Sequence, residues 1–174
     1  MSGTTTDIHN DADIAFAQQM IVHHQGAITM SDLAPTRASS AQVKQLAVDI
    51  KAAQGPEITQ MTGWLNVWAP AMNSMTTATP TGGMGGMGNT ITGSVMSMPG
   101  MMSDDQMTAL TAASGIAFDK LFLQLMITHH QGALTMAQTE KATGENPDAL
   151  ELADLITASQ TSQISTMQGL LKGM

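Results

Sequence analysis

One phrase occurs twice in this chain of 174 residues. It reads FAQQMIVHHQGAITM at residues 16–30 and FLQLMITHHQGALTM at residues 122–136, so each position of the second copy stands 106 residues after its counterpart. Four of the five histidines lie in the two copies, as two adjacent pairs. The duplication indicates a fold built from two similar units, each of which supplies one histidine pair.

Both copies have the period of an amphipathic helix. At about 100° per residue, Phe16, Met20 and His24 fall on one face, and the second copy repeats this arrangement. The other histidine of each pair falls on the flank of that face. We therefore predict two helices that carry paired imidazoles among thioethers: Met20, His23, His24 and Met30 on the first, and Met126, His129, His130 and Met136 on the second.

This combination of donor atoms favours a soft metal ion. Thioether sulfur selects Cu(I), and imidazole nitrogen binds copper as well as zinc and nickel. An imidazole must be neutral before it binds a metal, whereas a thioether carries no proton at ordinary pH. The simpler interpretation is that the histidines are hydrogen-bonded core residues and the methionines fill the core. We favour metal binding because both histidine pairs recur with their flanking methionines.

A second helical element is also duplicated. Residues 45–63 and 151–169 share apolar positions and a glutamine at the same offset of 106. Each half of the chain is therefore predicted to be a helical hairpin. A single hairpin leaves its apolar face uncovered, and two hairpins can bury both faces by packing together. We predict an all-α fold, a four-helix bundle made of two repeated hairpins. Packing of each hairpin on another chain is the alternative.

The segment between the hairpins differs in composition from both. Residues 69–103 contain seven glycines, eight methionines and no charged residue. Connections longer than about 12–15 residues without secondary structure are usually functional or disordered. Closely spaced sulfurs on a flexible chain suit a soft ion, although an ordinary disordered linker is the alternative. Six linker methionines are therefore candidate ligands: Met84, Met87, Met96, Met98, Met101 and Met102. The chain divides into a flexible tail (1–9), a first hairpin (10–68), this linker (69–103) and a second hairpin (104–174).

Composition excludes several classes of protein. The chain has no cysteine, which excludes disulfides, thiolate metal sites and cysteine nucleophiles. Fourteen acidic and six basic residues give a net charge of −8, which argues against binding to nucleic acid phosphates. No run of about 18 apolar residues is present, so no membrane span is predicted. No signal peptide is visible, and we expect this sequence to be the mature part if the protein is exported.

The pattern F-x-x-x-M-I-x-H-H-x-G-A-x-x-M resembles the signature of the domain-of-unknown-function 305 family. The resemblance covers both hairpins and leaves out the tail and the linker. It implies a ferritin-like helical bundle of the kind that bacteria export. Some members, those of the CopM type, bind copper in the periplasm or at the cell exterior. The resemblance thus implies copper binding at His23, His24, His129, His130 and their methionine neighbours, in an extracytoplasmic compartment.

The leading functional prediction is a copper-binding protein that is not an enzyme. It would hold Cu(I), with Cu(II) or Ag(I) as alternatives, for sequestration, delivery or resistance. The expected partners are metal ions and a copper-exporting or copper-accepting protein, and the oligomeric state is left open. A structural or interaction bundle without metal is the alternative. A di-iron oxidase would need Glu-x-x-His pairs, which the chain lacks, and a copper redox enzyme remains a weaker possibility.

Three local features carry further predictions. Gly55–Pro56 should kink the second helix or restart it, because proline removes a backbone donor. Gln54 and its counterpart Gln160 could hydrogen-bond the histidine rings. His9 should be a solvated residue of the tail.

Overall fold

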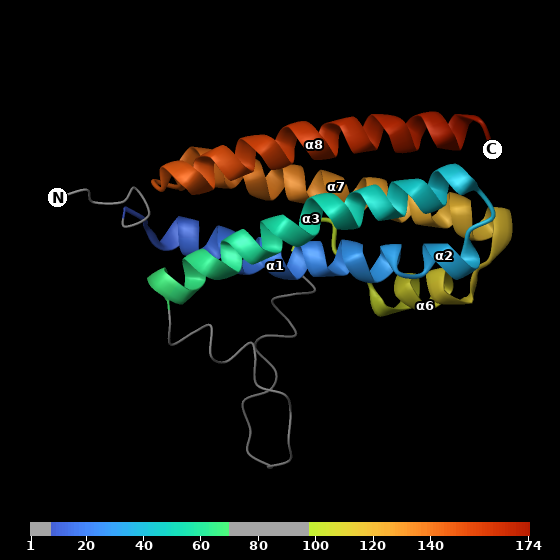
Figure 1. Ribbon diagram of the computed structural model, residues 1–174, viewed down its shortest axis with the longest axis horizontal. Coiled ribbons are helices and arrows are strands. Elements are labelled where there is room, and N and C mark those ends of the chain that lie inside the picture. Colours follow the sequence, from blue (N-terminus) through green and yellow to red (C-terminus); the bar gives the residue numbers. More distant parts are fainter. Residues whose placement is uncertain (1–7, 70–97) are drawn as a thin grey trace, which may run out of the picture.

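The structure is a computed structural model that describes residues 8–69 and 98–174. Every regular element in these two ranges is a helix, which confirms the prediction of an all-α protein. Figure 1 shows four long helices that run side by side, with a short helix beside them. In chain order the helices are α1 (Asp11–Ser31), α2 (Ala34–Arg37), α3 (Ala41–Trp68), α6 (Asp104–Ala112), α7 (Gly115–Thr143) and α8 (Pro147–Lys172).

Polar side chains cap most of these helices. Asn10 at the start of α1 and Ser103 at the start of α6 each form a capping box. Ser40 and Asn146 cap α3 and α8 through one main-chain N–H each.

Helix α3 passes through Gly55–Pro56 without a break, so of the two predicted outcomes the restart is wrong and the kink stays a prediction. Buried residues on both sides, including Ile50 and Met61, hold the two halves of the helix against one bundle.

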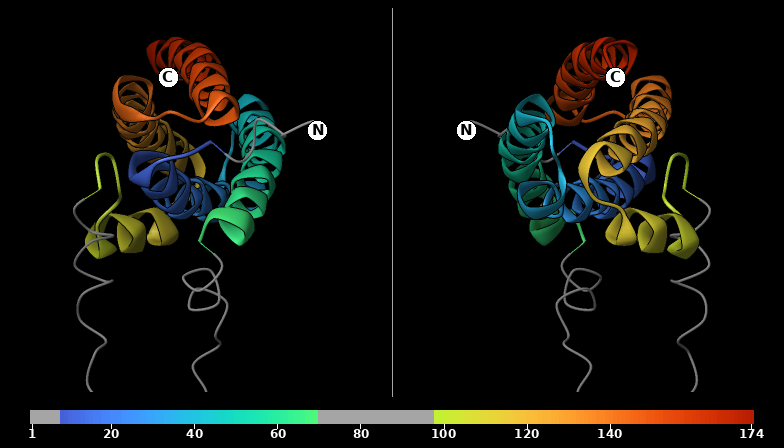
Figure 2. Two further views of the ribbon diagram at one scale, coloured as in Figure 1. Left: turned by 90° about the vertical axis from the view of Figure 1, so that its left-hand side faces the viewer. Right: turned by 90° about the vertical axis from the view of Figure 1, so that its right-hand side faces the viewer.

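The helices form two hairpins that meet through α1 and α7. Helix α1 packs along α3, and α7 packs along α8. Seen along the bundle in Figure 2, the four long helices surround one common axis. The bundle class that was predicted is confirmed, whereas the ferritin-like assignment stays a prediction. So does the division into tail, hairpins and linker, because residues 1–7 and 70–97 lie outside the described ranges.

One aspartate of each hairpin accepts hydrogen bonds from the turn of the other hairpin. Asp119 on α7 accepts hydrogen bonds from the main-chain N–H groups of Ser39 (3.1 Å) and Ser40 (2.9 Å), and another from the Ser39 hydroxyl. Asp13 on α1 accepts from the N–H groups of Glu145 (3.1 Å) and Asn146 (3.0 Å). Each partner stands 106 residues from its counterpart, so the two joints are equivalent. Because each aspartate bonds the opposite turn, α1 and α7 must run antiparallel.

The apolar core divides into two clusters along the bundle. One contains Met30 and Met126 with Phe118 and Phe122. The other contains Met20 and Met136 with Phe16, Trp64 and Trp68. Residues of α1 before the histidines meet residues of α7 after them, and the reverse. The histidine pairs therefore lie between the two clusters, at the middle of the bundle.

His9 does not behave as a solvated tail residue. Its ring stacks on Trp68 with a centroid distance of 5.0 Å, and the neighbouring Ile8 carbonyl accepts a hydrogen bond from Asn146. The prediction for His9 was wrong because the pattern before α1 contains no apolar partner for it. That partner lies at the far end of α3. Among the described residues, no helix is long and apolar enough to cross a membrane.

Candidate metal centre

The four phrase histidines are brought together at the contact between α1 and α7. Each has a relative exposure of 1% or less. The rings of His23 and His129 are in direct contact, with centroids 3.7 Å apart and planes tilted by 35°. The His130 centroid lies 6.4 Å from that of His129. The sequence therefore located a real cluster, and the antiparallel packing of α1 on α7 places the two pairs together.

Three of the rings are oriented by a hydrogen bond through Nε2. His24 donates to the Glu57 carboxylate over 2.6 Å, and His130 donates to the Gln163 amide oxygen over 2.6 Å. Glu57 and Gln163 are repeat counterparts, so the same helical position accepts the orienting hydrogen bond in both hairpins.

The third oriented ring, His23, donates to the Pro99 carbonyl over 3.1 Å. Gln54 and Gln160, which were predicted for this role, are buried and have no hydrogen-bond partner. The prediction missed the true partners by three residues, just under one helical turn.

These bonds leave ring nitrogens without partners. When a neutral imidazole donates from Nε2, its Nδ1 carries the free lone pair. The Nδ1 atoms of His23, His24 and His130 are buried and have no hydrogen bond of ordinary geometry, and the same holds for both ring nitrogens of His129. Buried polar atoms in native proteins are nearly always paired, so each exception calls for a ligand or a water.

Burial favours the uncharged form of His23, His129 and His130. Desolvation, together with the neighbouring His24, lowers the pKa of His23 to about 4. Desolvation also lowers the pKa of His130 to about 4, and it lowers that of His129 well below its ordinary value, with His23 adding to the effect. A neutral ring keeps a lone pair on nitrogen, which is the form that binds metal.

A short stretch that precedes α6 covers the His23–His129 contact from outside. Gly100 has φ of +77°, a conformation that favours glycine, and it lies against the main chain of α7 at Gly132. A Cβ on Gly132 would overlap the Pro99 carbonyl. This close approach brings Pro99 to His23 and carries the methionines that follow it to the same face of the bundle.

One of these methionines reaches the histidines. The Met101 sulfur and the His129 Nε2 lie 3.8 and 3.1 Å from the position that a Cβ on Gly26 would take. Glycine at position 26 thus leaves room for a thioether beside an unpaired imidazole nitrogen. Met101 and His129 were predicted as separate candidate ligands, and their proximity was not predicted.

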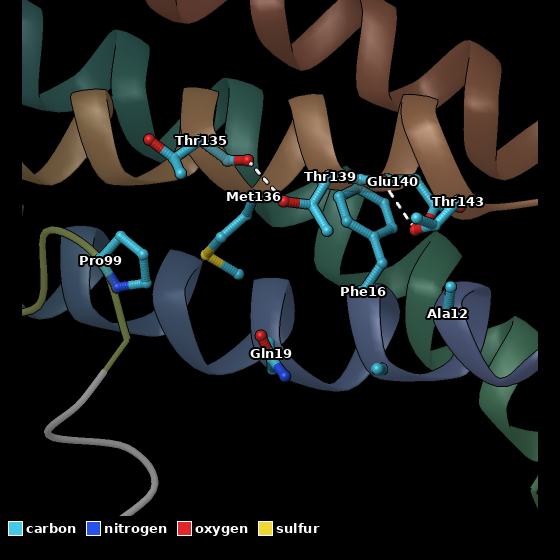
Figure 3. Close-up of a pocket in the computed structure, with 10 residues that line it drawn as sticks. Ala12, Phe16, Gln19, Pro99, Thr135, Met136, Thr139, Glu140 and Thr143 are labelled. Atoms are coloured by element: carbon cyan, nitrogen blue, oxygen red, sulfur yellow. Dashed lines mark hydrogen bonds between the residues drawn. The ribbon is translucent and has the colours of Figure 1, made fainter.

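Two cavities lie on either side of the stretch from Pro99 to Met101, along the groove between α1 and α7. The first, about 120 Å³, is lined by His129 and four methionines, and we name it the Met30 pocket: Met30, Met101, Met102 and Met107. The second, about 290 Å³, is the Met136 pocket, where a single thioether lies between Pro99 and Phe16 (Figure 3). Met30 and Met136 are repeat counterparts, so these are equivalent positions with different surroundings. Met107 was not predicted, because it falls outside both the phrase and the linker.

Of the remaining candidate ligands, Met98 is half-buried in the stretch before α6, and the others lie in the apolar core or outside the described residues. Met20 and Met126 are fully buried in the apolar clusters. Met84, Met87 and Met96 lie outside the described residues. Within residues 8–69 and 98–174, no three or more His, Asp or Glu side chains converge as a preformed metal site. Any metal held here would therefore use mixed nitrogen and sulfur donors or induce a rearrangement.

Comparison with known proteins identifies the family. The family model described as "Domain of unknown function (DUF305)" matches residues 13–171, which include both hairpins and the joints between them. The chain belongs to the DUF305 family. The resemblance that was drawn from the duplicated phrase is confirmed. No curated protein matches the chain.

Solved structures of DUF305 proteins share this fold. A Streptomyces coelicolor protein is 33% identical, with a TM-score of 0.75, and the match covers 93% of this chain and 91% of the other. A DUF305 fragment from Deinococcus radiodurans is 27% identical, with a TM-score of 0.76 and coverages of 95% and 98%.

A third similar structure carries copper in its description. It is CopM in the Cu(II)-bound form, 31% identical with a TM-score of 0.69, and the match covers 92% of this chain and 96% of CopM. CopM structures in Cu(I)-bound and Ag-bound forms are similar to the chain to the same degree.

Proposed function

We propose that this DUF305 protein binds Cu(I) and Ag(I) through histidine and methionine side chains of its bundle, with Cu(II) as a further ligand, and that it is not an enzyme. One observation carries the proposal. Four buried imidazoles meet between the two repeats, and each presents at least one nitrogen that no protein group satisfies.

The orientation of the rings supports metal binding. Metal-ligating histidines usually donate their other N–H to a carboxylate, carbonyl or water, which fixes the tautomer. His24, His130 and His23 do so to Glu57, Gln163 and Pro99. A core that served packing alone would gain nothing from leaving the opposite nitrogens unpaired, because each such atom costs about 1–3 kcal/mol.

The sulfur donors support a soft ion. Met101 approaches His129, and three further methionines line the adjoining Met30 pocket. Thioethers favour Cu(I) over hard cations. CopM, whose structures include copper- and silver-bound forms, has the same fold at about 30% identity. The remaining predicted ligands, Met20, Met126, Met136 and the linker methionines, stay proposals of lower rank.

The biological role that follows is copper sequestration, delivery or resistance outside the cytoplasm. The compartment is supported by the CopM relationship and by a Streptomyces coelicolor neighbour whose description suggests that it is secreted. The absence of cysteine suits an oxidising environment, where thioethers outlast thiolates. A copper-exporting or copper-accepting protein is the expected partner. We also propose that the bundle is of the ferritin-like type.

The proposal can be tested by titration of the metal-free protein with Cu(I) against a chromophoric chelator. The variant H23Q/H129Q should lose the tightest binding while its melting temperature stays measurable. Met61→Leu, a buried methionine remote from the phrase in sequence, serves as the control. Retention of full stoichiometry and affinity in both H23Q/H129Q and H24Q/H130Q would overturn the assignment to these histidines.

A bundle without metal is the second candidate, and it is favoured because no three His, Asp or Glu side chains among the described residues form a metal site. The two functions differ in a simple measurement. Silver at about 1,000 times its Kd stabilises a protein that binds it only when folded by about 4 kcal/mol, which corresponds to a rise in melting temperature of roughly 10 °C. An unchanged melting temperature in excess Ag(I) would select the structural role.

A further inference from the structure

The Met30 pocket has a different character from the buried imidazole cluster. Its walls come from α1, α6, α7 and the stretch before α6, and four of the residues that line it are methionines. Met101, Met102 and Met107 are half-buried, whereas His23 and His24 have no exposure. The pocket therefore reaches the surface, and an ion could arrive there without passing through the core.

The local backbone explains why the sulfurs gather. Gly100, with its positive φ, turns the chain onto α7, so that Met101 and Met102 follow directly over the groove. Ser103 then starts α6 with a capping box, and Met107 lies one turn inside that helix. Met30 projects from α1 on the other side.

The donor set fits one class of ion. No Asp or Glu is among the described residues that line the pocket, so all its sulfur donors are neutral. A doubly charged ion would lack charge compensation here, whereas a single positive charge on a polarisable ion is well matched by thioethers. His129 adds an unpaired nitrogen at the inner end of the pocket, with a relative exposure of 1%.

The equivalent pocket in the other repeat provides the contrast. The Met136 pocket has one methionine, threonines on the same face of α7, and Glu140 at one end (Figure 3). It shares the repeat-equivalent pair Thr135 and Met136 with Thr29 and Met30 of the first pocket. No described helix contributes further thioethers to it.

We infer that the Met30 pocket is a thioether site for a single Cu(I) or Ag(I) ion, in which Met107 of α6 is a ligand together with Met30, Met101 and Met102. The inference rests on the proposed function and refines it. It assigns the ion's surface-accessible position to one repeat and adds a ligand outside the duplicated phrase. His129 connects this site to the buried imidazoles.

The test follows each methionine by NMR of protein labelled with ¹³C at the methionine methyl groups. Addition of one equivalent of Ag(I) should shift the resonances of Met30, Met101, Met102 and Met107 together. The resonance of Met61, which is buried in the other core cluster, should not move. Zn(II), whose protein ligands are thiolate, imidazole and carboxylate groups, should leave the four pocket resonances in place.

Variants test the role of Met107. M107L and M102L preserve side-chain volume, and each should weaken Ag(I) binding by at least about tenfold, the change that 1.4 kcal/mol produces. M61L is the matched control and should bind Ag(I) as the unmodified chain does. The melting temperature without metal verifies folding of each variant.

The outcomes separate the two claims. If Ag(I) binds, but the Met107 methyl does not shift and M107L and M102L bind normally, the pocket assignment is wrong and copper binding by the histidines stands. If neither Ag(I) nor Cu(I) binds the unmodified protein, the proposed function and the pocket both fall.

Discussion

The two repeats contain the same histidine phrase, but the residues beside it differ. On one side of the groove between α1 and α7, Met30 meets three further thioethers, and on the other Met136 meets threonines and an acid. His24 donates to a carboxylate, whereas its counterpart His130 donates to an amide. Duplication thus provides a symmetric frame, and a few unmatched residues set the chemistry at each end.

The same contrast holds at the two joints. Asp119 and Asp13 accept equivalent main-chain hydrogen bonds, but Asp13 has a second acid, Glu140, beside it, whereas the repeat counterpart of Glu140 is Ala34. Burial by itself would raise the pKa of Asp13, yet the hydrogen bonds that it accepts lower it below the ordinary value. Burial raises the pKa of Glu140 to about 8, and the adjacent Asp13 adds to the effect. The joint at Asp13 is therefore sensitive to pH through Glu140.

The largest effect is expected at the joint without the second acid. Asp119→Ala leaves two main-chain N–H groups and the Ser39 hydroxyl unpaired, and should lower the free energy of unfolding by about 3–5 kcal/mol. Asp13→Ala should lower the free energy of unfolding by a smaller amount, because it also removes the negative charge that raises the pKa of the buried Glu140. Urea denaturation of both variants measures the difference, and an equal or larger loss for Asp13→Ala would contradict the unequal joints.

The next largest effect is a difference in stability between alanine substitutions at the two glycines of the duplicated phrase, Gly26 and Gly132. Gly132→Ala would force the Pro99 carbonyl away and should cost about 1–3 kcal/mol. Gly26→Ala, its counterpart, meets His129 Nε2 at 3.1 Å and should cost less than about 1 kcal/mol, while it weakens binding of Ag(I). Thermal unfolding with and without Ag(I) checks both. Equal destabilisation by the two substitutions would show that the segment before α6 does not press on α7.

The pH dependence of the metal-free protein separates the imidazoles from Glu140. Burial lowers the pKa of His23 and His130 to about 4 and that of His129 well below 6.5, so the folded state binds fewer protons below pH 6.5 and stability rises with pH up to that point.

Glu140 acts in the opposite direction. Its folded pKa of about 8 exceeds the ordinary 4.5, so the folded state holds an extra proton and stability falls with pH between those values. Three imidazoles outweigh one carboxyl below pH 6.5, which places the maximum near pH 6.5. The decline from there to pH 8 should be about 1–2 kcal/mol. Glu140→Gln should remove that decline in urea titrations, and its persistence would mean that Glu140 does not cause it.

The smallest effect is expected at the hydrogen bonds of His24 and His130. Glu57→Gln makes the partner of His24 the same as that of His130, which exchanges a charged hydrogen bond for a neutral one. The free energy of unfolding should change by about 1 kcal/mol. The reverse variant, Gln163→Glu, should change it by a similar amount in the other direction. Chemical denaturation measures both, and a loss of several kcal/mol from Glu57→Gln would show that the carboxylate has another role.

Much of the fold was accessible from the sequence. Helical period and duplication at a constant offset predicted the two hairpins, because both are local properties of the chain. The phrase also located the four histidines that the structure brings together. The unbroken path of α3 through Pro56 could not be read locally, because packing on both sides of the proline determines it.

What the sequence by itself determined is the inventory: two helical hairpins, two imidazole pairs, and abundant thioethers without any thiol. Only the tertiary structure decided which of these atoms meet. The antiparallel contact of α1 with α7 placed His23 against His129, and the turn at Gly100 set Met101 and Met107 on one side of that contact. Contacts between distant segments depend on the relative placement of whole helices, which the burial of their apolar faces fixes and no local pattern records.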